Sequence, residues 1–175
     1  KQDFIMALAF SPDGEHIAAG YFSQVAQIWN LSTEEPSAAM PHDAAVVGID
    51  YSEDGVRLLT ASLDGHVRLW NPSNATELCQ PMPHDSQVLS VWFDDTDQQA
   101  LSLTLGGQAT AWNLATSPAY DVPSLFDGEV GAMSRDLQRS VVYRNNRIYL
   151  QKADGTLSEH QPTNRPESIR FCRFR

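Results

Sequence analysis

The sequence predicts an all-β fold built from repeated four-stranded antiparallel sheets, and three observations support this prediction. Similar stretches recur along the chain at intervals of 41 or 42 residues. Turn residues such as Asp-Gly divide each stretch into short segments rich in apolar and β-branched residues, which is typical of antiparallel hairpins. No stretch has the 3.6-residue apolar period of a surface helix over the length of a helix.

The repeats align on their tryptophans. Trp70 follows Trp29 by 41 residues, and Trp112 follows Trp70 by 42. The aligned copies span residues 4–31, 41–72, 83–114 and, with weaker similarity, 129–155. A period of about 40–45 residues with a tryptophan near its end is typical of the four-stranded blade of a β-propeller.

The second copy shows how one blade divides into strands. A Ser-Glu-Asp-Gly turn at 52–55 follows the first apolar segment, and Asp64-Gly65 separates two strand-like segments. Glycine tolerates the positive φ that such tight turns require. The four strands are expected at residues 46–51, 56–62, 66–70 and 77–80.

These units make the chain one domain over residues 1–175. The blades are expected at about residues 4–40, 41–82, 83–122 and 123–162. Residues 163–175 are expected to start a fifth blade, because Ile169, Cys172 and Phe174 repeat the apolar spacing of a first strand. We therefore expect a segment of a larger propeller, with a closed four-bladed ring or a two-chain, eight-bladed ring as the alternatives.

The copies resemble WD repeats, the Trp-Asp blades of β-propellers, with Trp-Asn in place of the usual Trp-Asp. The matching pattern is His-x-x-x-Val-x-x-Ile-x-Tyr-Ser at 42–52, Ser-x-Asp-Gly at 62–65 and Leu-Trp at 69–70. The Met-Pro-His-Asp segments before the second and third copies resemble those of bacterial WD-repeat arrays. Such arrays are often fused to serine/threonine kinase or NTPase modules.

The resemblance implies a hydrogen-bonded network of His, Ser or Thr, Asp and Trp in each blade. The second copy matches at all four positions, whereas Gly106 takes the Asp position in the third. The first copy keeps the Trp, with Tyr21 and Ser23 in the Ser and Asp positions. The expected network residues are His42, Ser62, Asp64, Trp70, His84, Thr104, Trp112 and Trp29.

His42, Ser62 and Asp64 are also the residue types of a nucleophilic triad. Their recurrence with the blade period favours a structural role, in which a buried network satisfies polar groups where strands converge. The sequence contains no nucleophile elbow, phosphate-binding Gly-rich loop or kinase motif. We therefore expect no catalytic residues, no enzyme activity and no cofactor in this segment.

Metal binding is not expected either. Cys79 and Cys172 have neither CxxC nor zinc-ligand spacing, so free thiols in a reducing, cytoplasmic location are the preferred interpretation. Asp94, Asp95 and Asp97 could hold calcium, but they lack the alternating spacing and final Glu of a calcium loop. A solvated turn is the preferred interpretation of these three carboxylates.

The composition restricts the class of partner. Twelve basic and 22 acidic residues give the 175-residue chain a net charge of −10. The acidic body, residues 1–134, repels phosphate backbones and anionic lipid, so nucleic acid and membrane surfaces are not expected as partners. No apolar run approaches the roughly 20 residues that a membrane-spanning helix needs.

The resemblance also implies a partner-binding face. Propellers of this kind contact proteins or peptides through positions that flank the first apolar residue of each first strand or precede the turn Asp. Here they are Phe4, Met6, Phe22, Ala45, Val47, Leu63, Gln87, Leu89 and Leu105. Exposed contiguous apolar area usually marks an interaction site. The alternative is that Val47 and Leu89 pack between strands and leave Phe4, Phe22, Leu63 and Leu105 exposed.

The predicted function is therefore a non-catalytic protein- or peptide-binding scaffold within a larger WD-repeat propeller. The remaining blades of that propeller would be its first partners. The alternative function is a regulatory or sensor propeller region of a bacterial multidomain serine/threonine kinase or NTPase. A propeller hydrolase or dehydrogenase is disfavoured, because the expected contact positions are apolar and not titratable.

Overall fold

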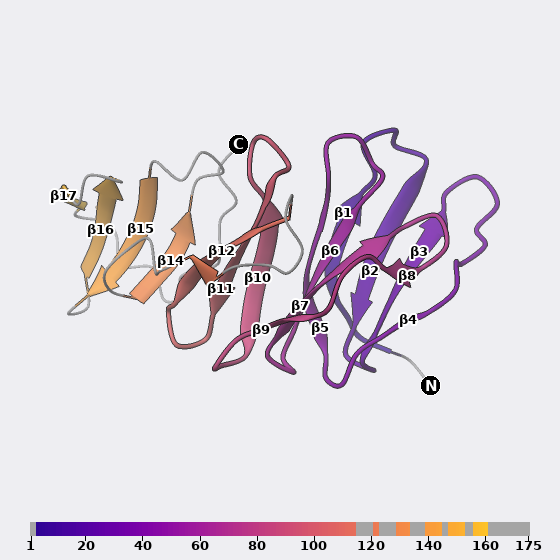
Figure 1. Ribbon diagram of the computed structural model, residues 1–175, viewed down its shortest axis with the longest axis horizontal. Helices are drawn as coiled ribbons and strands as arrows, with labels where there is room; N and C mark the ends of the chain where they lie inside the picture. The colour runs from indigo at the N-terminus through magenta and orange to yellow at the C-terminus, as the bar shows by residue number, and fades with distance from the viewer. Residues whose placement is uncertain are drawn as a thin grey trace.

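A computed structural model describes residues 3–114, 121–122, 129–133, 139–144, 147–152 and 156–160. All regular secondary structure within these ranges is β-strand, which confirms the predicted fold class. The strands form four antiparallel sheets that follow one another in chain order, side by side in Figure 1. Within the same ranges, no helix is long and apolar enough to cross a membrane.

Each sheet is a meander in which consecutive strands pair. The first contains β1 (Ile5–Phe10), β2 (His16–Tyr21), β3 (Val25–Asn30) and β4 (Met40–Pro41). The second contains β5 (Val46–Tyr51), β6 (Leu58–Ser62), β7 (His66–Asn71) and β8 (Thr76–Glu77), with β9 (Met82–Pro83) also paired to β7.

The third and fourth sheets repeat this order. The third contains β10 (Val88–Phe93), β11 (Gln99–Thr104), β12 (Ala109–Asn113) and β13 (Asp121–Val122). The fourth contains β14 (Glu129–Met133), β15 (Arg139–Arg144), β16 (Arg147–Lys152) and β17 (Leu157–His160). The first strand of a fifth blade, expected at 163–175, lies outside the described residues.

Two strands of the second sheet differ from the prediction. The second strand starts at Leu58 and not at residue 56, because the Asp54 and Ser52 side chains accept the backbone N–H groups of Val56 and Arg57 and keep both in the turn. The prediction places the fourth strand at 77–80, whereas in the structure two short strands, Thr76–Glu77 and Met82–Pro83, pair with β7. Pro81 interrupts this pairing, since proline has no N–H to donate.

Two apolar clusters hold the first three sheets together. One joins the first and second sheets through small residues such as Ala18 and Ala26, packed beside Ile49 and Leu58. The other joins the second and third sheets and includes Phe93, which is fully buried. Packing between sheets, and not a single central core, therefore stabilises the array.

Close approach of the second and third sheets depends on Gly48. A Cβ atom at this position would lie 3.0 Å from the Cβ of Ala61 and 3.2 Å from the backbone nitrogen of Val91 in the next sheet. Contacts this short would force the third sheet away from the second. Only glycine leaves room for β10 at this point.

One face of the first sheet is uncovered. Ile5, Leu8 and Phe10 on β1 are 54%, 55% and 66% exposed. The residues at the same positions of the next two sheets are at most 7% exposed, because each packs against the preceding sheet. These residues are Val46, Ile49, Tyr51, Val88, Val91 and Phe93.

Candidate functional site

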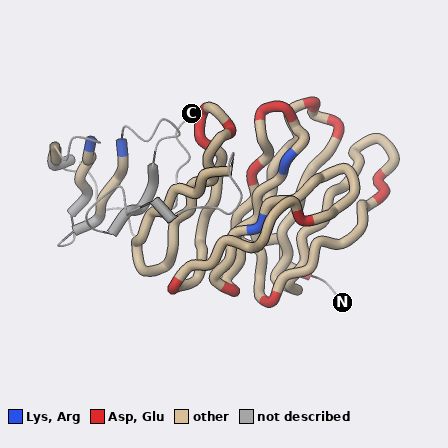
Figure 2. The backbone as a smooth tube through the Cα atoms, viewed as in Figure 1, with Lys and Arg blue, Asp and Glu red and all other residues tan. Residues whose placement is uncertain are grey.

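The first strands β1, β5 and β10 present two ends to the surface. The predicted partner-binding face lies where these strands begin, beside the turns from the second strand to the third. At the other end are three acidic turns, defined here as residues 11–15, 52–57 and 94–98, which connect each first strand to its second. Figure 2 shows the Asp and Glu residues of these turns along the upper edge of the array. Six-residue strands separate the two ends by about 20 Å.

The backbone assembles the predicted face in the same way in three sheets. In each of these sheets, the residue that follows the second strand donates its N–H to the carbonyl of the residue immediately before the first strand. These bonds join Phe22 to Phe4 at 2.9 Å, Leu63 to Ala45 at 3.0 Å and Leu105 to Gln87 at 2.8 Å. The face therefore consists of three equivalent side-chain pairs, one in each sheet.

A β-bulge in the first strand positions a third face residue in each of the three sheets. The pairing register shifts between Ile5 and Ala7 in the first sheet, and shifts at the equivalent positions of the next two sheets. Met6, Val47 and Leu89 are the unpaired residues at these bulges. Bulges commonly redirect side chains next to functional sites.

Exposure divides the nine face residues into two groups. Phe4, Phe22 and Leu105 are 71%, 61% and 62% exposed, and Met6 and Gln87 are also exposed. The remaining four residues are half-buried or buried: Val47, Leu63, Leu89 and Ala45. Large apolar side chains thus reach solvent in the first and third sheets. The partner-binding role of this face stays a prediction.

A hydrogen-bond network supports the face in the second sheet, but its hydroxyl belongs to Thr60 and not to Ser62. Thr60 Oγ1 lies 2.8 Å from His42 Nε2 and accepts the Trp70 indole N–H at 2.9 Å. Trp70 is the cross-strand partner of Leu58. Its indole therefore reaches the hydroxyl of Thr60, two residues further along β6, and not that of Ser62, four residues further. Ser62 instead donates to the Ala44 carbonyl in the adjoining turn.

The third sheet differs from the prediction in the same way. His84 Nε2 lies 2.6 Å from Ser102 Oγ, and the Trp112 indole N–H donates to the same His84 nitrogen at 3.2 Å. Thr104, the expected hydroxyl, contacts Gln108 within the β11–β12 turn. Thr60 and Ser102 are 42 residues apart, but so are Ser62 and Thr104, so the repeat spacing alone could not distinguish the two sets of hydroxyls.

The first sheet keeps the tryptophan bond with another partner. The Trp29 indole N–H donates to the hydroxyl of Tyr21 at 2.9 Å. Ala19 occupies the position equivalent to Thr60 and offers no hydroxyl. The long Tyr21 side chain reaches across two residues of β2 to replace it.

Asp64 has a different role from the predicted one, because its carboxylate holds Arg68 and not His42. The Arg68 guanidinium donates to Asp64 at 2.7 Å, and the two side chains are 8% and 5% exposed. Backbone N–H groups of Asp43 and His66 also donate to Asp64. Burial opposes ionisation of Asp64, but these bonds outweigh it and hold the pKa of Asp64 below its usual value. Sequence analysis did not identify Arg68.

We expect Thr60→Val to destabilise the protein by about 1–3 kcal/mol, since it leaves the buried Trp70 indole N–H and His42 without their shared hydroxyl. Urea unfolding followed by tryptophan fluorescence measures the change. Thr60→Ser keeps the hydroxyl and is expected to cost less. Ser62→Ala tests the corrected assignment, and an equal cost for Ser62→Ala and Thr60→Val would contradict it.

We expect His42 to make stability fall with acid. Burial, together with the nearby positive charge of Arg68, lowers the pKa of His42 from 6.5 to about 4. The unfolded chain therefore takes up a proton below pH 6.5 that the folded protein excludes until about pH 4. The contribution is intact above pH 6.5 and is lost as pH falls to about 4, by up to about 3 kcal/mol.

Urea unfolding of the wild type and of His42→Gln at several pH values between 4 and 6.5 measures this contribution. The free energy of unfolding of the variant should depend less on pH over this window. Parallel pH dependences for the two proteins would show that His42 does not carry the effect.

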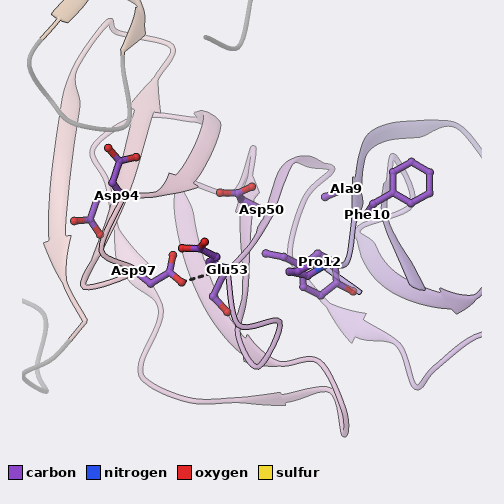
Figure 3. Close-up of a pocket in the computed structure, with 10 residues that line it drawn as sticks. Ala9, Phe10, Pro12, Asp50, Glu53, Asp94 and Asp97 are labelled. Atoms are coloured by element: carbon purple, nitrogen blue, oxygen red, sulfur yellow. Dashed lines mark hydrogen bonds between the residues drawn. The ribbon is translucent and has the colours of Figure 1, made fainter. Parts of the chain in front are cut away.

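A pocket of about 460 Å³ lies at the acidic turns and spans three sheets. In Figure 3, Asp94, Asp97, Glu53 and Asp50 lie on one side of the view, and Ala9 and Pro12 lie on the other. Asp95 and Tyr51 also line the pocket. Phe10 is also among the lining residues, and its labelled ring points away from the carboxylates (Figure 3).

Comparison with known families and proteins agrees with this architecture. Residues 1–30 and 35–71 match the family model described as WD40, WD domain, G-beta repeat. Among curated proteins, the chain is 36% identical to human Striatin-3 over 80 residues, which are 39% of the chain and 10% of that protein. It is 39% identical to Arabidopsis thaliana Pre-mRNA-processing factor 19 homolog 2 over 66 residues, 37% of the chain and 12% of that protein.

A third relative is a G-protein subunit. The chain is 32% identical to the guanine nucleotide-binding protein G(I)/G(S)/G(T) subunit beta-1 of Homarus americanus over 68 residues, 38% of the chain and 20% of that protein. The matched stretches thus cover only 10–20% of these three relatives. All three are eukaryotic, and the resemblance to bacterial arrays stays a prediction.

Solved structures extend the similarity over most of the chain. The β-propeller domain of Myceliophteria thermophila Cps50 (Swd1) matches with a TM-score of 0.72 at 15% identity, over 88% of this chain and 53% of that one. U3-55K matches with a TM-score of 0.74 at 17% identity, over 92% of this chain and 54% of that one. The chain spans about half the length of both structures. Its four sheets are therefore blades of a β-propeller, with WD repeats recognised over residues 1–30 and 35–71.

Proposed function

We propose that this chain is part of a non-catalytic scaffold that binds a protein or peptide through the predicted face. The observation that carries the proposal is the exposure of Phe4, Phe22 and Leu105, at 71%, 61% and 62%, on turns that backbone hydrogen bonds hold in equivalent positions. Apolar side chains on rigid elements bind partners at low entropic cost. A cytoplasmic location is part of the proposal, supported by half-buried Cys79, whose thiol forms no disulfide within the described residues.

A photocrosslinking amino acid at position 105 tests the proposed binding face. We expect it to crosslink a discrete partner in cells, and Phe22→Ser should abolish the product. The same amino acid at position 31, an exposed Leu on the outer β3–β4 connection, is the matched control. The partner is then purified and its binding to the wild type and to Phe22→Ser is measured directly. Equal affinity for both proteins would overturn the assignment of this face.

We further propose that another blade of the same propeller covers the exposed face of β1. The equivalent faces of β5 and β10 pack against the preceding blade, and their residues are at most 7% exposed. Ile5, Leu8 and Phe10 supply the same kind of apolar surface at the same positions but are more than half exposed. Burying this surface against a further blade would extend the contact that already joins blades one, two and three.

Sedimentation of the 175-residue chain tests the covering blade. The exposed β1 face should cause the isolated chain to self-associate, and the double variant Leu8→Ser/Phe10→Ser should reduce that association. The matched variant Leu31→Ser/Leu78→Ser changes two exposed apolar residues elsewhere and should leave association unchanged. A monodisperse wild-type monomer that unfolds in one sharp transition would overturn the proposal.

A further inference from the structure

We infer that the predicted face binds a partner segment in which apolar side chains are interspersed with lysine or arginine. The inference rests on the proposed scaffold function and adds the chemistry of the partner. It comes from acidic residues that lie among the apolar side chains of this face. Figure 2 shows Asp and Glu positions along the lower edge of the array as well as at the acidic turns on the upper edge.

Asp43 lies where the first blade meets the second. The residue before it, His42, donates its backbone N–H to the Gln24 carbonyl in the β2–β3 turn of blade one at 2.9 Å. The N–H of Asp43 itself donates to the Asp64 carboxylate in the β6–β7 turn of blade two at 3.1 Å. The Asp43 side chain is 90% exposed. An exposed carboxylate therefore stands between two turns of the predicted face.

Asp85 occupies the same place between the second and third blades, 42 residues after Asp43. The preceding residue, His84, donates its backbone N–H to the Gly65 carbonyl in the β6–β7 turn of blade two at 2.8 Å. A Cβ atom at Gly65 would lie 3.3 Å from the carbonyl oxygen of His84 and 3.5 Å from that of Ser86. The segment on both sides of Asp85 therefore packs closely against this turn, and Asp85 itself is exposed.

Apolar and acidic groups thus succeed one another across the predicted face. Each of the three turns carries an apolar residue of the face, and an Asp lies at each junction between blades. In blade order, the groups are Phe4 with Phe22, then Asp43, Leu63, Asp85 and Leu105. A partner whose side chains follow the same order buries apolar groups on apolar groups and places basic groups beside the carboxylates.

Acidic groups outnumber basic groups in this region. Between residues 3 and 114 the only Lys or Arg residues are Arg57 and Arg68, and Arg57 belongs to an acidic turn at the opposite end. Arg68 is 8% exposed and has three carboxylates around it, those of Asp64, Glu77 and Asp43 at 2.7, 3.5 and 3.8 Å. One guanidinium thus serves three carboxylates. The remaining negative charge attracts a basic partner.

Two further carboxylates of the face have no cation. Asp3 and Asp85 form no ion pair with any residue that the structure describes. Neutral donors hold Asp3 beside the face, because its carboxylate accepts the Phe4 N–H at 2.9 Å and the hydroxyl of Ser23. A purely apolar partner would cover these carboxylates without pairing them, which costs free energy. The charges therefore favour a partner with basic residues over a purely apolar one.

Selection from a phage-displayed library of random dodecapeptides tests the inference without assuming a sequence. The 175-residue chain is the bait, and peptides that also bind Phe22→Ser are discarded. We expect the remaining peptides to combine apolar residues with a net positive charge. Phe22-dependent peptides with neutral or acidic sequences would overturn the inference.

Calorimetric titration with the most enriched peptide measures the contribution of the two junction carboxylates. Asp43→Asn/Asp85→Asn should weaken binding by about fivefold or more, because it removes two negative charges from the face. Glu53→Gln/Asp95→Asn makes the same charge change at exposed residues of the acidic turns, about 20 Å away, and should change affinity less than about twofold. Urea midpoints close to that of the wild type verify that both double variants remain folded.

The outcomes distinguish this inference from the proposed function. If Phe22→Ser abolishes binding while Asp43→Asn/Asp85→Asn binds as tightly as the wild type, the inference is wrong and the scaffold function stands. Equal weakening by the two double variants would assign the effect to general electrostatic attraction and overturn the inference as well. If no selected peptide depends on Phe22, the predicted face is not the binding site and both proposals fail.

Discussion

Asp64→Ala should destabilise this protein by about 3–5 kcal/mol, one of the two largest effects expected of a single substitution here. The change removes the carboxylate that pairs with Arg68 at 2.7 Å, where both side chains are at most 8% exposed. The Asp43 and Glu77 carboxylates also pair with the guanidinium, at 3.8 Å and 3.5 Å, but their side chains are 90% and 38% exposed, so solvent screens both pairs. The buried guanidinium would therefore keep only these two weaker pairs.

Asp43→Ala is the matched control for this prediction. It removes the same kind of side chain from the same guanidinium, but the Asp43 side chain is 90% exposed. Solvent screens such a pair, so we expect a cost of less than about 1 kcal/mol. Urea unfolding of the two variants and the wild type measures both changes. Equal costs would show that the Asp64–Arg68 pair is no more important than a surface contact.

Phe93→Ala should also cost about 3–5 kcal/mol, through loss of apolar burial and the cavity left behind. Phe93 is fully buried in the cluster between blades two and three, and its ring carries the Arg57 guanidinium. Its neighbour Asp94 begins the turn that forms one wall of the acidic pocket. The substitution is therefore expected to weaken the packing that positions this wall.

Phe10→Ala provides the control, because Phe10 occupies the equivalent position in blade one. Its ring is 66% exposed, so truncation should change the free energy of unfolding by less than about 0.5 kcal/mol in the monomeric chain, at concentrations too low for self-association. Urea unfolding of Phe10→Ala and Phe93→Ala compares one residue type at one blade position with and without a covering blade. A cost for Phe10→Ala close to that for Phe93→Ala would contradict the uncovered face of β1.

Most of the fold follows from local sequence. Turn chemistry and alternating apolar residues act over a few positions, and the repeat spacing carries them from one blade to the next. Gly14 and Gly55 illustrate this, since each adopts a positive φ at the turn where the sequence places it. The predicted start of the second strand in blade two was wrong, because the Ser52 and Asp54 side chains hold residues 56 and 57 in the turn despite their strand-like sequence.

The candidate sites were less predictable because their contacts cross strands or blades. Residue types indicated a His, hydroxyl and Trp network, but the cross-strand register of β6 and β7 selects Thr60 over Ser62. Arg68 has no motif of its own, and only folding encloses it beside Asp64. Separation along the chain conceals such pairs from analysis of the sequence alone.

The sequence by itself determined the strand order, the blade period and the position of the predicted face, since each depends on neighbours a few residues apart. The tertiary structure decided which hydroxyl joins His42 and Trp70, and which face of β1 stays exposed. It also decided that Asp50, Glu53 and Asp95 share one pocket. These outcomes depend on the registers of paired strands and on the packing of blades about 40 residues apart, distances over which local propensity carries no information.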